Sequence, residues 1–110
     1  MDFNEYQKKT RETAEYGGGY GLGIMALVYT VLGLNGEAGE VAEILKKEIR
    51  KGNVTLSIDA KARILDELGD VLWYLASICH ELGVELNWVA GQNLDKLQER
   101  KRVGQIKDHN

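Results

Sequence analysis

Apolar residues recur at intervals of three and four over two long stretches of the chain, which is the spacing of a helix with one buried face. In the first stretch this stripe consists of Leu27, Val31, Leu34, Ala38, Val41 and Leu45. In the second stretch it consists of Ile64, Leu65, Leu68, Val71, Leu72, Leu75 and Ile78. Gly52 and Gly83 follow the two stretches and Ser57 precedes the second, as helix stop and start signals do. The pattern predicts long helices over about residues 24–51 and 58–82.

The flanking segments predict two further helices. Residues 2–16 carry one weak apolar stripe, and Asn87 is expected to cap a helix that continues to about Arg102. The glycine-rich run at residues 17–23 is expected to form a flexible connection or hinge. The chain contains no proline, which favours long helices. We therefore predict an all-α fold in a single domain over residues 1–110, a four-helix bundle whose two long helices pair antiparallel.

Composition and charge narrow the class of protein. A chain of 110 residues buries a limited share of its surface, so oligomerisation is a natural way to enlarge its core. The net charge of −3 argues against a nucleic-acid partner bound through a broad basic field. The apolar run at residues 23–34 is too short for a membrane span, and the charged N-terminus lacks the apolar core of a signal peptide. We therefore expect a cytoplasmic protein without a membrane partner.

Two pairs of acids lie inside the two long helices. Glu37 and Glu40 are three residues apart in an apolar setting, and Glu67 and Asp70 repeat this spacing. On a helix, that offset places both side chains on one face. If the helices pair antiparallel, the four carboxylates converge, where they repel and desolvate one another. Mg²⁺ relieves this cost because it prefers oxygen ligands and leaves positions for water and phosphates, so the two pairs indicate a magnesium site.

Each acid pair encloses a glycine, Gly39 or Gly69. A glycine inside a helix costs about 1 kcal/mol relative to alanine, which close approach of the facing helix or of phosphate groups would explain. A single ExxE motif is most often a solvated helix face, but two such pairs beside apolar residues favour metal binding. A di-iron carboxylate site needs ExxH motifs, and neither pair here ends in histidine.

At these residues the sequence resembles the MazG-like all-α nucleoside triphosphate pyrophosphohydrolases. The hallmark of that family is an ExxE motif, a gap, and then an ExxD motif. Here the motifs read EAGE at residues 37–40 and ELGD at residues 67–70, within the strings GEAGEVAEILKK and DELGDVLWYL. The segments FNEYQKKTRETAEY and NLDKLQERK extend the resemblance over nearly the whole chain.

The resemblance implies an oligomeric helical enzyme, a dimer or a dimer of dimers. It implies Mg²⁺-dependent hydrolysis of a (deoxy)nucleoside triphosphate between the α and β phosphates, which releases the monophosphate and pyrophosphate. Mn²⁺ is a possible substitute for Mg²⁺. The metal ligands, which are also the catalytic residues, are then Glu37, Glu40, Glu67 and Asp70.

The resemblance also implies substrate-binding residues. The last helix carries an NxxKxxxR pattern whose members share one face, where a lysine and an arginine hold phosphate: Asn93, Lys96 and Arg100. Tyr74 lies four residues after Asp70 and resembles a family tyrosine that contacts the nucleotide.

Some features stay open. Glu43 is either a general base or outer ligand, or a solvated partner of Lys46 or Lys47. Some relatives carry an extra glutamate before each acid pair, where this chain has Gly36 and Asp66, so the sequence does not fix the number of metal ions. The sequence also does not determine which nucleobase the substrate carries. A pyrimidine-specific dCTP or dUTP pyrophosphatase and a non-catalytic helical interaction module are the alternatives.

Overall fold

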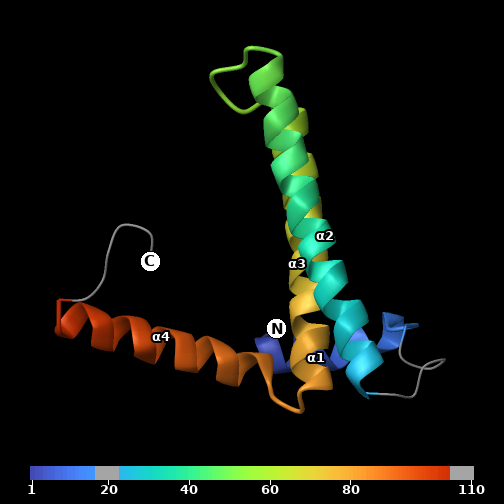
Figure 1. The fold of residues 1–110 in the computed structure, drawn as a ribbon, viewed down its shortest axis with the longest axis vertical. Coiled ribbons are helices and arrows are strands. Elements are labelled where there is room, and N and C mark those ends of the chain that lie inside the picture. The colour runs from blue at the N-terminus through green and yellow to red at the C-terminus, as the bar shows by residue number, and fades with distance from the viewer. Residues whose placement is uncertain (17–22, 105–110) are drawn as a thin grey trace.

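The computed structural model describes residues 1–16 and 23–104, and every regular element within them is helical (Figure 1). These elements are α1 (Phe3–Thr10), the 3-10 helix η1 (Arg11–Thr13), α2 (Gly23–Arg50), α3 (Ile58–Glu81) and α4 (Leu86–Arg102). The predicted all-α fold is therefore confirmed. Residues 17–22, most of the glycine-rich run expected to act as a hinge, lie outside the described residues.

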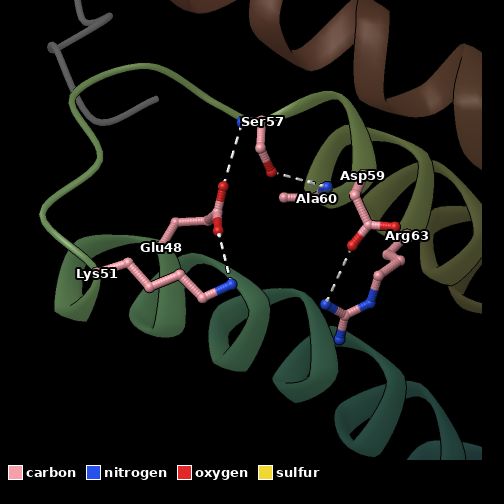
Figure 2. A network of polar contacts seen from close by, with 6 residues as sticks. All are labelled: Glu48, Lys51, Ser57, Asp59, Ala60 and Arg63. Carbon is pink, nitrogen blue, oxygen red and sulfur yellow. Dashed lines mark hydrogen bonds and ion pairs between the residues drawn. The ribbon is translucent and has the colours of Figure 1, made fainter.

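The helices α2 and α3 form an antiparallel hairpin and lie side by side over most of their length (Figure 1). Its loop is closed by Glu48, whose buried carboxylate accepts a 3.1 Å hydrogen bond from the backbone N–H of Ser57 (Figure 2). The Ser57 hydroxyl accepts a further 3.1 Å bond from the N–H of Ala60, and Gly52 has a φ of +80°. The predicted stop at Gly52 and cap at Ser57 are thus confirmed, and they determine how α3 returns along α2.

The first helix is shorter than the sequence predicts, because α1 ends at Thr10 rather than near Tyr16. The next residue, Arg11, donates a hydrogen bond to the Ser77 hydroxyl at 2.6 Å and another to the Tyr16 hydroxyl at 2.9 Å. These contacts with α3 and with the following segment hold residues 11–13 in a tight 3-10 turn. These tertiary hydrogen bonds therefore outweigh the weak helical pattern of residues 11–16.

The last helix starts at Leu86, so the prediction that Asn87 caps it is wrong. A side chain of α1 supplies the cap instead. The backbone N–H of Leu86 donates to Oε1 of Gln7 at 2.7 Å, and Nε2 of Gln7 donates to the Val84 carbonyl at 2.9 Å. Gln7 thereby joins α1 to the turn between α3 and α4, next to a small core of Ala76, Cys79 and Leu86.

Beyond this junction α4 extends away from the hairpin (Figure 1). Its side chains Trp88 and Leu94 are exposed. On α2, Val31 and Leu32 are exposed as well and help to line an open hollow of about 550 Å³. Exposed apolar residues that line a hollow, as on α2, are typical of protein interfaces. Within the described residues, none of the helices combines the length and the apolar composition that crossing a membrane requires.

Candidate metal centre

The hairpin brings the two acid pairs to the same level. Glu37 lies on α2, and Glu67 and Asp70 lie on α3. One carboxylate oxygen from each of these three residues lies within 4.8 Å of the other two. Such a group of oxygens suits a single divalent cation, because hard cations take several carboxylate ligands at once.

Without a cation, these acids interact unfavourably. A hydrogen bond between the carboxyl groups of Glu37 and Glu67 is the main reason that the pKa of Glu37 rises to about 7, and desolvation and neighbouring acidic charges add to it. Desolvation, followed by the charges of Asp66 and Glu67, also raises the pKa of Asp70. Oε2 of Glu67 is buried and has no hydrogen-bond partner among the described residues. A buried acceptor without a donor, beside two further acids, fits a hard cation such as Mg²⁺.

Glu40, the fourth predicted ligand, lies beside this group. Its charge contributes to the raised pKa of Glu37. It also lines an open pocket of about 360 Å³ together with Glu67, Asp66 and Arg63. The structure therefore places Glu40 near the three clustered oxygens but outside their group, in the lining of this pocket.

Arg63 is a cation at this pocket that the sequence analysis did not single out. It lies on α3 one turn before Glu67. Its ion pair with Asp59 is 3.9 Å long, and the Asp59 side chain is 85% exposed (Figure 2). Exposed pairs of this length hold a guanidinium weakly, so Arg63 is available to other anions. The spacing of four residues from Glu67 was the signal that could have identified it.

The structure excludes one of the two explanations for the glycines inside the acid pairs. A Cβ built on Gly39 or Gly69 meets no atom within 4 Å in the described part of the chain. Close approach of the facing helix is therefore the wrong explanation, and room for phosphate groups is the one that stays a prediction. A close contact occurs instead at Gly33, one turn before Glu37, where the side chain of Tyr74 on α3 lies against α2.

Glu43 does not lie in the group of three oxygens. Its carboxylate forms an ion pair of 3.4 Å with Lys46, and the side chains of Lys46 and Glu43 are 63% and 44% exposed. This contact supports the reading of Glu43 as a solvated partner of a neighbouring lysine.

Tyr74 adjoins the acids and is half-buried. Burial raises its pKa, and the charge and hydrogen bond of Tyr29 and the charges of Glu37 and Asp70 raise it further. The Tyr74 hydroxyl is therefore a neutral hydrogen-bonding group close to the candidate centre, as its position one turn after Asp70 predicts.

The predicted phosphate-binding residues of α4 lie elsewhere. Asn93 and Lys96 are exposed, and Arg100 is partly so. With a rise of 1.5 Å per residue, Arg100 lies about 21 Å along the helix axis from Leu86, and α4 runs away from the hairpin (Figure 1). Within one chain, the described residues therefore do not bring Asn93, Lys96 and Arg100 to the carboxylates.

Comparisons with known proteins agree with the site. A model of the MazG nucleotide pyrophosphohydrolase domain matches residues 28–104, which include both acid pairs and all of α4. The chain is also similar to the "Gene 37 protein" of Mycobacterium phage L5. The two are 40% identical over 107 residues, which span 96% of this chain and 94% of the phage protein. No solved structure gives a significant match.

Proposed function

The chain belongs to the MazG nucleotide pyrophosphohydrolase family, and we propose that it acts in the cytoplasm as a metal-dependent hydrolase of a (deoxy)nucleoside triphosphate. The products are the nucleoside monophosphate and pyrophosphate, and the cation is Mg²⁺ or, in its place, Mn²⁺. The observation that carries this proposal is the set of Glu37, Glu67 and Asp70 oxygens within 4.8 Å of one another. Three clustered acids, among them Glu37 and Asp70 with raised pKa values, have little structural use without a cation.

Glu37, Glu67 and Asp70 would hold the cation, with Glu40 as a fourth ligand from the pocket edge. When bound, Mg²⁺ polarises phosphate oxygens and offsets the charge that develops on them. The hydrogen bond between Glu37 and Glu67 implies a shared proton, and this proton must leave before both groups can act as ligands. The site is therefore more receptive to metal above neutral pH than below it.

Two residues of the hairpin serve the substrate in this proposal. Arg63 reaches the pocket beside Glu40 and neutralises the outgoing pyrophosphate end of the triphosphate. Tyr74 offers a neutral hydroxyl near the acids, where it can donate a hydrogen bond to an anionic oxygen.

The remaining substrate residues come from a second copy of the chain. Asn93, Lys96 and Arg100 lie on a helix that leaves the hairpin, and exposed apolar residues on α2 and α4 leave faces for a partner. We therefore propose a homodimer, or a tetramer of two such dimers, in which α4 of one copy approaches the acidic site of the other. The basic end of α4, residues 100–102, complements the acids of the hairpin.

The test is pyrophosphate release from standard and modified nucleoside triphosphates, dCTP and dUTP included, with Mg²⁺ and with EDTA. Release that requires Mg²⁺, yields the monophosphate and disappears in Glu67→Gln supports the proposal. Release confined to dCTP or dUTP makes the protein a pyrimidine-specific pyrophosphatase. If the folded protein releases no pyrophosphate from any of them, the proposal fails and a helical interaction module takes its place.

A further inference from the structure

The ring of Tyr74 lies directly on the backbone of α2 at Gly33. A Cβ built on Gly33 would lie 2.6 Å from Cδ1 of Tyr74, and closer still to Cε1 and Cζ. Real Cβ atoms essentially never approach another heavy atom to less than 3.0 Å, so an alanine at this position displaces the ring or the helix. By contrast, Cβ atoms built on Gly36 and Gly39, on the same helix, have open space within the described structure. The close approach is thus specific to Gly33.

The ring of Tyr74 is also held from its other sides. The indole of Trp73 packs edge-on against it, with ring centroids 5.1 Å apart and planes at 86°. The Tyr74 hydroxyl is hydrogen-bonded to Tyr29, and the ring of Tyr29 stacks on that of Tyr16 at 5.4 Å. A displaced Tyr74 ring would have to break these contacts, so the ring cannot yield cheaply to an added methyl group.

The contact lies next to the candidate metal centre because of the register of the hairpin. Glu37 follows Gly33 by four residues on α2, and Asp70 precedes Tyr74 by four residues on the antiparallel α3. Four residues are about one helical turn of 5.4 Å on each helix. The Tyr74 hydroxyl accordingly lies within the field of both carboxylates.

We propose that Gly33 is a positioning residue, whose missing side chain lets Tyr74 lie against α2 beside the acids, where its hydroxyl would turn from Tyr29 and donate to the anionic oxygens of a bound triphosphate. This inference rests on the proposed function, since those oxygens belong to the substrate. A hydroxyl suits this place better than an ammonium or guanidinium group would. A cation there would pair with Glu37 or Asp70 and compete with the metal ion, whereas a neutral donor leaves both carboxylates free.

A double-mutant cycle of Gly33→Ala and Tyr74→Phe tests the inference, with kcat and KM measured on the best triphosphate substrate at saturating Mg²⁺. Tyr74→Phe retains the ring and its contact with Gly33 but removes the hydroxyl. We expect it to lower kcat/KM by about tenfold to a hundredfold, the value of one hydrogen bond to a charged group. Gly33→Ala should cause a loss of similar size in the wild-type background, and less than about threefold in the Tyr74→Phe background.

The outcomes separate a positioning role from structural damage. Equal losses from Gly33→Ala in both backgrounds would mean that it merely disturbs packing, and would overturn the inference. Wild-type activity in Tyr74→Phe would overturn it too, and this variant alone decides the matter if Gly33→Ala does not fold. In both cases the wild-type protein still releases pyrophosphate, so the proposed function stands. A folded wild-type protein inactive on every triphosphate would remove the function and the inference together.

A matched substitution controls for helix propensity. Gly91 lies on α4, and a Cβ built there meets nothing within 4 Å in the described structure. Gly91→Ala should therefore raise the melting temperature, as alanine does at an exposed helical site. Gly33→Ala should lower it, despite the same change in intrinsic propensity.

Discussion

A carboxylate oxygen of Glu37 on α2 lies within 4.8 Å of one of Glu67 on α3, and hydrogen bonding between the two carboxyl groups raises the pKa of Glu37. Two carboxyl groups can bond in this way only when one of them carries a proton. The acidic site is thus built to hold either a proton or a cation, and its behaviour with pH follows from that competition.

The first prediction concerns the stability of the metal-free protein. The pKa of Glu37 is raised from 4.5 to about 7 in the fold, so the folded state keeps a proton that the unfolded chain loses. The stabilising contribution of this proton is complete below pH 4.5 and is lost as the pH rises to about 7. We expect the melting temperature of Glu37→Gln, which cannot ionise, to rise relative to wild type over this range. Thermal unfolding in EDTA at several pH values measures the difference, and a constant difference would contradict the shared proton.

The second prediction concerns the cation. Because Mg²⁺ must displace the proton between Glu37 and Glu67, Mg²⁺ should raise the melting temperature more at pH 8 than at pH 5.5. At a free concentration of 100 times Kd, the stabilisation is about 2.7 kcal/mol. Calorimetry in buffers of different ionisation enthalpy should show proton release on binding near pH 6.5. If Mg²⁺ stabilises the protein equally at both pH values, Glu37 and Glu67 are not its ligands.

The third prediction is that glutamates of the acid pairs are essential for turnover, whereas the neighbouring Glu43 is not. Glu67→Gln should reduce turnover by at least about a hundredfold while the helical circular dichroism signal persists, because losing one acid from a repulsive cluster does not harm the fold. Glu40→Gln should behave in the same way. The matched control is Glu43→Gln, since Glu43 is engaged with Lys46 at the surface and should keep nearly full activity. An inactive Glu43→Gln would return that residue to the role of general base.

Much of this architecture could be predicted because the signals are local. Ser57 caps α3 through Ala60, three residues away, and Gly52 adopts the positive φ that ends α2. The spacing of Glu37 from Glu40 fixes their common face in the same way. Each of these features depends on a few neighbouring residues, so a single sequence contains it.

The rest depends on contacts between distant residues. The cap of α4 comes from Gln7, which is 79 residues from Leu86, so the nearby Asn87 was a misleading signal. The reason for a glycine at position 33 is the ring of Tyr74 on the facing helix, and no pattern within α2 indicates it. Propensity and periodicity locate helices, but they do not say which side chains meet across them.

A fourth prediction tests the pocket beside Glu40. Arg63→Gln should raise KM for the triphosphate by about tenfold with a smaller change in kcat, because the guanidinium binds phosphate charge in the ground state as well as in the transition state. Lys61→Gln, an exposed cation on the same helix that does not line the pocket, serves as the control and should be close to wild type. If both variants lose the same amount, general electrostatic attraction accounts for the effect and Arg63 has no specific contact.

The last prediction tests whether α4 serves the site of a second copy. Glu67→Gln lacks a working acid site, and the double variant Lys96→Gln/Arg100→Gln lacks the cations of α4, so each should be nearly inactive alone. If the two sets of residues meet between copies, a mixed dimer contains one intact site, made from the acids of one chain and the α4 of the other. An equal mixture, exchanged by mild denaturation and refolding, should then recover about one quarter of wild-type activity, because half of the dimers are mixed and each has one working site of two. Were both sets to act within one chain, a mixed dimer would contain no intact site. Activity that stays at the level of the separate variants, with subunit exchange verified by mass, would therefore contradict the proposal that α4 of one copy completes the acidic site of the other.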